Sequence, residues 1–250
     1  MHSADDLLRD YSGNVPGASV LVVLDGNVVM RKSYGMANLE QRTAATPDTN
    51  YRLASVTKQF TAASILILAK SGKLSLDDPI TKYLALPAHA NAITIRHLLT
   101  HTSGLFDYED LIPPGTTRQL KDSDVLQMLK DNDGSYFAPG TRYRYSNTGY
   151  AFLSLIVERV SGQRFADFLS ENIFKPAGMN ASVALEEGIS TVARRAYGYS
   201  RADRAWHRTD QSLTSAVLGD GGIYTSTDDL VHWIAWLESG KFDAALVPAT

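Results

Sequence analysis

The feature that most constrains the fold is one stretch of helical pattern, Val56 to Lys70, in which apolar residues occupy almost every side. Phe60 and the run from Ile65 to Ala69 leave no continuous polar face. A helix that is apolar all round belongs in the interior of a protein. Ser71-Gly72 then supplies a helix stop. Other elements must therefore wrap around this helix, and 250 residues are enough to do so without disulfides or metal.

Strand patterns come first in the chain. The apolar run from Ala18 to Leu24 is followed by a turn at Asp25-Gly26-Asn27 and a second run from Val28 to Gly35, which predicts a β-hairpin. A polar and aromatic segment, Tyr197 to His207, is compatible with another hairpin. Helical patterns dominate between these segments and recur near the end of the chain: Ile95 to Thr100, Ser123 to Lys130, Thr148 to Val160, Phe165 to Ile173 and Asp228 to Leu237.

This order of elements predicts an α/β (α+β) fold, with an antiparallel sheet flanked by helices and an all-helical lobe. We expect a single domain over residues 1–250, because no linker or repeat divides the chain. Residues 1–55 with 205–250 would form the α/β lobe. Residues 56–204 would form a mainly helical lobe, with a cleft between the two.

Composition excludes several classes of function. The 24 basic and 27 acidic residues give a net charge of -3 without a basic run, which argues against nucleic-acid binding. The chain has no cysteine, so thiol catalysis, cysteine-ligated zinc and disulfides are excluded. No apolar run approaches the roughly 20 residues that a membrane-spanning helix needs. Met1 to Asp10 is charged and has no apolar core of a signal peptide.

The first chemical signal is Ser55-Val56-Thr57-Lys58, at the start of the apolar helix. Positions i and i+3 share a helix face, so the serine hydroxyl and the lysine amine can come within hydrogen-bond reach. A serine needs a base before it becomes a nucleophile, and a buried lysine can serve because burial lowers its pKa. Alternatively, Ser55 is only a helix cap and Lys58 a solvated residue of the first turn.

The second signal is Tyr145-Ser146-Asn147. A phenol beside a lysine ammonium is shifted toward phenolate, so Tyr145 could take the serine proton and later return it to a leaving group. Asn147 offers a donor and an acceptor to an amide substrate and to Lys58. The alternative is a turn after Pro139-Gly140 in which the tyrosine packs on the core.

In this order and at this separation, the two motifs resemble the signature of the serine β-lactamase and penicillin-binding protein family. The resemblance is to the branch of class C β-lactamases, D-alanyl-D-alanine carboxypeptidases and family VIII esterases. It spans essentially the whole chain, through Tyr51 to Ala54, Leu74 to Ile80, Leu98 to Leu105 and Gly221 to Leu230.

The resemblance implies a β-lactamase/transpeptidase-like fold without cofactor, in which Ser55 is acylated. It also implies that Lys58 and Tyr145 share general acid and base work and that Asn147 holds the substrate. We expect Gly222, which ends the Gly219–Gly222 turn region, and Tyr224, which follows it, as further substrate contacts. The substrate would be a small molecule or peptide with an amide, β-lactam or ester carbonyl. Tyr-Ser-Asn, where class C enzymes usually have Tyr-Ala-Asn, favours carboxypeptidase or esterase activity over efficient β-lactam hydrolysis.

The family's third motif, Lys-Thr-Gly or His-x-Gly on a late strand, does not occur in the expected order. We therefore expect the last strands and a second oxyanion donor to follow Thr250, in a truncated part or in a complementary C-terminal fragment. The alternative to an enzyme is a sensor or scaffold on the same fold that binds β-lactam or peptidoglycan without turnover. The expected location is periplasmic or secreted.

Three further patterns are weaker. His97 and His101 have metal-ligand spacing, but no third ligand is evident, so we expect capping and packing and no metal site. The glycines of Gly219–Gly222 lack the Lys-Ser/Thr of a phosphate loop and predict a tight turn beside the cleft. Tyr108, Tyr224 and Trp206 could line the cleft, although aromatic side chains are more often packed in the core or at its rim.

Overall fold

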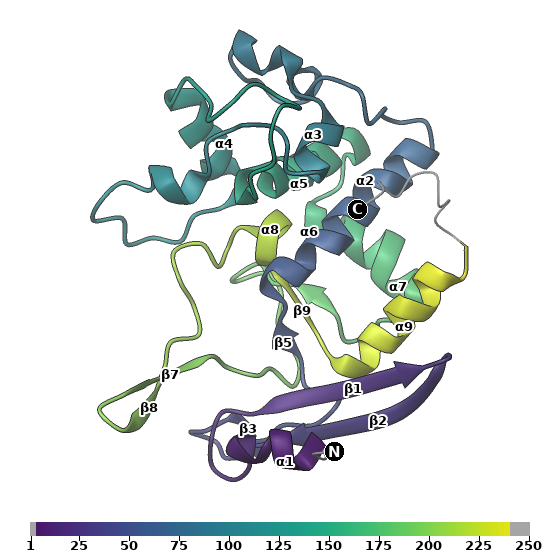
Figure 1. The fold of residues 1–250 in the computed structure, drawn as a ribbon, viewed down its shortest axis with the longest axis vertical. Helices are drawn as coiled ribbons and strands as arrows, with labels where there is room; N and C mark the ends of the chain where they lie inside the picture. Colours follow the sequence, from purple (N-terminus) through teal and green to yellow (C-terminus); the bar gives the residue numbers. More distant parts are fainter. Residues whose placement is uncertain (1–3, 241–250) are drawn as a thin grey trace.

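The computed structural model describes residues 4–240, in which a helical part and a strand-containing part meet around one central helix. Figure 1 shows α3 (Ile95–Leu99), α4 (Asp122–Asp131) and α5 (Asn147–Ser161) at one end of the molecule. The β1–β2 hairpin lies at the other end, and α2 (Lys58–Lys70) runs between them. The shorter helices are α1 (Ala4–Leu7), α6 (Phe165–Leu169), α7 (Lys175–Ala177) and α8 (Leu218–Gly221), and α9 (Thr227–Glu238) follows them.

Within residues 4–240, the strands form four small antiparallel sheets. They pair as β1 (Ala18–Leu24) with β2 (Asn27–Tyr34), β3 (Met36–Asn38) with β4 (Thr43–Ala44), and β7 (Tyr199–Ala202) with β8 (Ala205–Arg208). The fourth sheet has the order β5 (Tyr51–Arg52), β9 (Ile223–Thr225), β6 (Val183–Ala184). This last sheet fixes the chain just before Ser55 against the chain just after Gly222.

The predicted hairpin over residues 18–35 is present, and its turn has the backbone that the sequence requires. Asp25 and Gly26 both have positive φ, 49° and 75°, as the central residues of a type I′ turn do. Ala18 pairs with Tyr34, and a bulge follows Val22. The helix α9 lies along β1 (Figure 1), and Arg31 donates to Asp228 at 2.6 Å across this contact.

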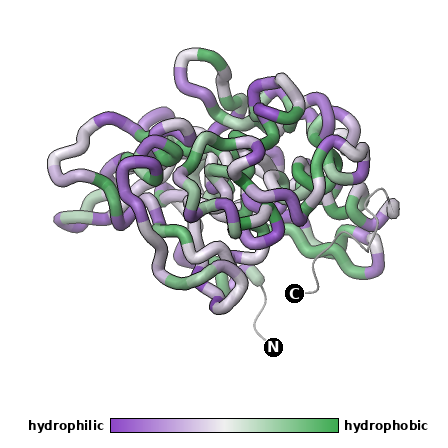
Figure 2. Tube along the Cα trace, turned by 90° about the horizontal axis from the view of Figure 1, so that it is seen from above, coloured by the Kyte–Doolittle hydropathy of each residue, from purple (hydrophilic) through white to green (hydrophobic). Residues whose placement is uncertain are grey.

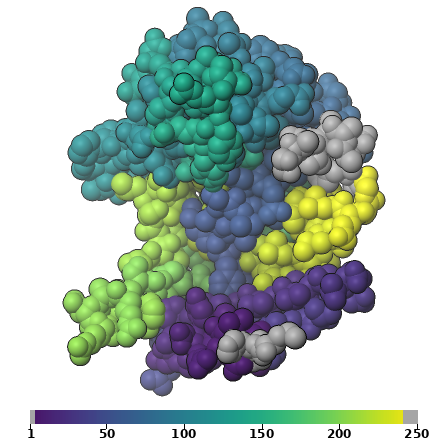
Figure 3. Space-filling model, viewed as in Figure 1, coloured from purple at the N-terminus to yellow at the C-terminus, as the bar shows by residue number. Residues whose placement is uncertain are grey.

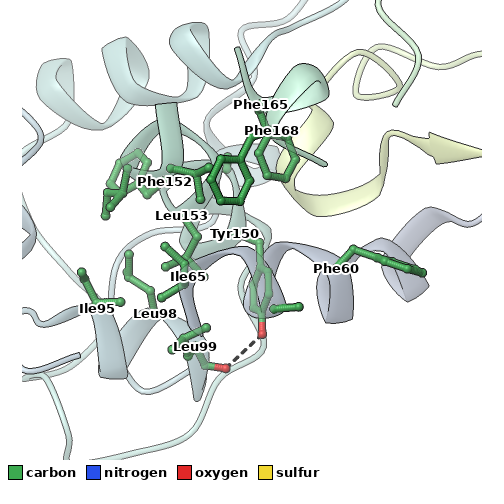
Figure 4. Close-up of a cluster of buried hydrophobic side chains, with 14 of the residues drawn as sticks. Phe60, Ile65, Ile95, Leu98, Leu99, Tyr150, Phe152, Leu153, Phe165 and Phe168 are labelled. Carbon is green, nitrogen blue, oxygen red and sulfur yellow. Dashed lines mark hydrogen bonds between the residues drawn. The ribbon is translucent and has the colours of Figure 1, made fainter. Parts of the chain in front are cut away.

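The predicted central helix is α2, which begins two residues later than expected. Phe60 and Ile65 are fully buried, and they pack in one continuous core with α3, α5 and α6. Figure 4 shows Ile65 among Leu98, Leu99 and Leu153. Because α2 is surrounded on several sides, almost all of its sequence could be apolar, as the pattern required.

The division into an α/β lobe and a helical lobe stays a prediction. Two strands, β6 and β7, come from the range 56–204 that we assigned to the mainly helical lobe. Among the described residues, no helix has the length and apolar character needed to cross a membrane. Hydrophobic residues instead recur in short stretches along the trace (Figure 2).

Candidate active site

Ser55 lies in a single 3₁₀ turn, Ala54–Thr57, immediately before α2. Its side chain is exposed, and Figure 3 shows this part of the chain reaching the surface between the helical part and the hairpin. Residues i and i+3 eclipse each other in a 3₁₀ turn. Lys58, the first residue of α2, therefore stands directly beside Ser55, and its Nζ donates to Ser55 Oγ at 3.1 Å.

Tyr145 and Asn147 reach the same place from the start of α5. Ser146 caps this helix by accepting from the Gly149 N–H. Its two neighbours point toward Ser55: Tyr145 Oη donates to Ser55 Oγ at 2.6 Å, and Asn147 Oδ1 accepts from Lys58 Nζ at 2.8 Å. The four residues of the two sequence motifs are thus joined by direct hydrogen bonds, as predicted, while their chemical roles stay predictions.

Lys58 has a third acceptor that sequence reasoning missed. Its Nζ donates to the main-chain carbonyl oxygen of Asp220 in α8, at 3.0 Å. With Ser55 and Asn147, all three donors of an ammonium group have partners. The lysine side chain is 7% exposed and lies 4.9 Å from the centre of the Tyr145 ring.

Two carboxylates approach Asn147 from the segment that follows the Ser103-Gly104 turn. Asp107 Oδ2 accepts from the Asn147 main-chain N–H at 2.7 Å, and Glu109 Oε1 accepts from Asn147 Nδ2 at 3.3 Å. Burial, followed by the charge of Asp107, raises the pKa of Glu109, whose side chain is still exposed. Sequence reasoning missed both residues, although the acidic run Asp107 to Asp110 was visible.

His101 contacts Tyr145 directly. Its ring stacks on Tyr145 with 4.6 Å between centroids, and its Nδ1 accepts from the Ser146 main-chain N–H at 3.2 Å. Burial and the nearby Lys58 charge lower the pKa of His101 to about 4, so the ring is neutral at physiological pH. His97 closes a capping box with Thr94. Within residues 4–240, no cluster of three potential metal ligands occurs.

The structure does not bring Tyr224 or Gly222 into the group around Ser55. Tyr224 is 1% exposed, and its Oη accepts from Arg195 and Gln211 instead. The Gly222 carbonyl accepts from the Leu185 N–H, so it serves the β6–β9 connection. Within residues 4–240, neither residue hydrogen-bonds Ser55, Lys58, Tyr145 or Asn147, and their roles as substrate contacts stay predictions.

The other two aromatic candidates for lining the cleft, Tyr108 and Trp206, differ in exposure. Tyr108 is completely buried, with its Oη donating to Asp220 Oδ2 at 2.9 Å, and Trp206 is partly exposed on β8. A cavity of about 870 Å³ is bordered by Asp122, Arg195 and Leu218 but not by Ser55. The predicted second oxyanion donor, after Thr250, lies outside the described residues.

Comparison with known proteins gives a consistent set of relatives. The family model described as Beta-lactamase matches residues 4–249. Penicillin-binding protein 4* of Bacillus subtilis is 36% identical over 231 residues, covering 86% of this chain and 51% of that protein. The D-aminopeptidase of Brucella anthropi is 33% identical, covering 94% of this chain and 44% of that protein. The chain thus spans about half the length of these curated relatives.

Solved structures extend the likeness. A penicillin-binding protein from Bacillus halodurans superposes with a TM-score of 0.82 at 32% identity, covering 98% of this chain and 76% of that one. The D-amino acid amidase of Ochrobactrum anthropi, solved with L-phenylalanine amide, gives a TM-score of 0.80 at 27% identity, covering 96% and 69%.

Proposed function

The chain belongs to the serine β-lactamase and penicillin-binding protein family, and from this premise we propose that it is a serine hydrolase that forms an acyl-enzyme on Ser55. The observation that carries the proposal is the pair of hydrogen bonds that Ser55 Oγ accepts, from Tyr145 Oη and from Lys58 Nζ. A serine hydroxyl in this position lies beside a tyrosine oxygen, which takes the serine proton when it reacts as the phenolate, and beside a positive charge that stabilises the developing alkoxide.

The proposed mechanism requires Tyr145 to react as the phenolate, with the Lys58 ammonium beside it as the neighbouring positive charge. Ser55 Oγ attacks the substrate carbonyl carbon while its proton passes to Tyr145. The tetrahedral intermediate collapses when Tyr145 returns that proton to the leaving nitrogen or oxygen. A water molecule then attacks the acyl-enzyme. Tyr145 takes a proton from this water and passes it to Ser55 Oγ as the serine leaves.

For the substrate, we propose an amide or ester of a small D-amino acid in preference to a β-lactam. Two relatives are named for D-amino substrates. Glu109 supports the same class, because it presents an exposed carboxylate that already hydrogen-bonds Asn147. A free α-amino group on the substrate would be attracted to this charge. A periplasmic or secreted location and a complementary C-terminal fragment stay predictions.

The proposal is tested with the purified protein and Ser55→Ala, with Ser12→Ala as a matched change of an exposed serine before β1. We expect hydrolysis of p-nitrophenyl butyrate and D-phenylalanine amide to fall at least about a thousandfold in Ser55→Ala and to stay unchanged in Ser12→Ala. Mass spectrometry should find a fluorescent penicillin attached to Ser55. If penicillin attaches but no substrate is turned over, the protein is better explained as a β-lactam sensor. If penicillin does not attach and no substrate is hydrolysed, the proposed enzyme is refuted.

The substrate class has its own test. Glu109→Gln should raise KM for D-phenylalanine amide and leave N-acetyl-D-phenylalanine amide unaffected, because only the first carries a positive charge. Equal effects on both amides would contradict a role for Glu109 in recognising the amine.

A further inference from the structure

A buried pair, Tyr108 and Asp220, lies beneath the ammonium group of Lys58. Asp220 is 6% exposed, and its two polar functions face different partners. Its main-chain carbonyl accepts from Lys58 Nζ, and its carboxylate accepts from Tyr108 Oη. Tyr108 is fully buried, and burial together with the neighbouring Asp220 raises its pKa, so the phenol keeps its proton and remains a donor.

Tyr108 also begins the short 3₁₀ turn that reaches Asn147. This turn covers residues Tyr108–Leu111, and Asp107 is its cap. Asp107 and Glu109, on either side of the tyrosine, accept from the main-chain N–H and from Nδ2 of Asn147, respectively. These contacts therefore form a closed ring. Lys58 bonds Asn147, Asn147 bonds the segment 107–109 that contains Tyr108, Tyr108 bonds Asp220, and Asp220 bonds Lys58 again. Each link holds one of the groups that orient the lysine.

The helix α8, which carries Asp220, is held on its other sides as well. Asp122 of α4 accepts from the Leu218 and Gly219 N–H groups at 2.8 and 3.0 Å, and Thr61 of α2 donates to the Gly219 carbonyl at 2.7 Å. A helix of four residues has little stability of its own, so these contacts fix its position. The Asp220–Tyr108 hydrogen bond adds the connection to the Asn147 side of the site.

We propose that Tyr108 and Asp220 are positioning residues for the catalytic lysine, and that the hydrogen bond between them keeps Lys58 in register with Ser55 and Asn147. This inference rests on the proposed function, because it requires Lys58 to take part in the reaction. It makes the electrostatic state of Asp220 part of the site, since both the charge of its carboxylate and its main-chain carbonyl act on the same ammonium group.

The surroundings of Asp220 place its ionisation in the working pH range. The charged and titratable groups that face it are Asp122, Lys58, Tyr108 and Arg52. Burial and then the charge of Asp122 raise the pKa of Asp220, whereas Lys58 lowers it, and the result is about 7. Above this pH the carboxylate stabilises the Lys58 ammonium, and below it that support is lost. Activity should therefore decline on the acid side of neutrality.

The experiment uses Tyr108→Phe, Asp220→Asn and the double variant, assayed with p-nitrophenyl butyrate between pH 5 and pH 9. We expect Tyr108→Phe to lower kcat about tenfold to a hundredfold with little change in KM, because the lysine moves out of register. Asp220→Asn should remove the ionisation near pH 7 from the profile of kcat/KM, which reports groups of the free enzyme. The double variant should lose little more than either single variant, because both changes break one interaction.

Tyr83→Phe is the matched control, because it breaks a tyrosine–aspartate hydrogen bond, with Asp78, outside the group around Ser55. Its kcat and pH profile should match those of the unmodified protein. Folded Tyr108→Phe with normal kcat, or a double variant whose losses simply add, would overturn the inference. Should Tyr108→Phe not fold, an unchanged pH profile in Asp220→Asn would overturn it. An unmodified protein that neither hydrolyses ester nor binds fluorescent penicillin would instead reject the proposed function.

Discussion

Replacement of Asp220 by asparagine should change how the stability of the protein depends on pH. Raising the pKa of this carboxyl from 3.8 to about 7 in the folded state corresponds to about 4 kcal/mol, at about 1.4 kcal/mol for each factor of ten. The folded protein holds this proton more tightly than the unfolded chain does. The stabilisation is therefore complete below the unfolded pKa of 3.8 and is lost as pH rises through about 7.

Between pH 5 and pH 8, the unfolding free energy of the unmodified protein should fall by about 2–3 kcal/mol on account of this one group. Asp220→Asn has no such ionisation, so its stability relative to the unmodified protein should rise by that amount over the same range. Urea denaturation followed by the fluorescence of the buried Trp233 and Trp236 measures both proteins. The difference between the two proteins cancels the pH dependence of the remaining groups.

Asp78→Asn provides the control. A hydrogen bond from Tyr83, followed by one from a main-chain amide, lowers the pKa of Asp78 to about 2, so this carboxyl is ionised in both states above pH 5. The free energy of unfolding of Asp78→Asn, plotted against pH, should therefore run nearly parallel to that of the unmodified protein from pH 5 to pH 8. If the curve of Asp220→Asn is also parallel over this range, the reasoning about burial at Asp220 is wrong.

Phe60→Ala should lower the unfolding free energy by about 3–5 kcal/mol in urea titrations, because the ring is fully buried against Trp233; a loss below 1 kcal/mol would contradict this packing. Gly219→Ala should cost about 1–3 kcal/mol and also lower kcat, because its methyl group would lie 2.3 Å from the Tyr150 carbonyl oxygen and displace α8; normal kinetics would refute this. Arg31→Ala should leave the melting temperature nearly unchanged, because its ion pair with the first turn of α9 is exposed to solvent; a clear drop in melting temperature would contradict this reasoning.

The parts of the fold that could be predicted from sequence are those with strong local signals. The hairpin turn needs residues that tolerate positive φ, and Asp25-Gly26 provides them. The apolar pattern after Ser55 predicted a central helix, and α2 fills that position. The short strands β5 and β9 carried no such signal, since two or three residues are too few to show a period.

The residues of the candidate site also differ in whether the sequence carries a signal for them. Ser55 and Lys58 are three residues apart, so local geometry alone brings them together. Tyr145 and Asn147 were recognised by family resemblance, and the structure places them on the same hydroxyl and amine. Asp220 was missed because its contribution to the lysine is a main-chain carbonyl, which any residue type could supply. Glu109 was missed because an exposed acidic run is usually only solvated surface.

The contact between β1–β2 and α9 has a consequence for biosynthesis. An isolated two-stranded hairpin is marginally stable in water, and this one packs against α9 through β1. The helix that packs on it, α9, begins at Thr227, and the Arg31–Asp228 ion pair joins residues 197 positions apart. At about 5–20 residues per second, a ribosome takes roughly 10–40 seconds to extend the nascent chain over that distance. During this time β1 and β2 lack the helix that packs against them. We therefore expect newly made chains to be bound by chaperones until α9 has been synthesised.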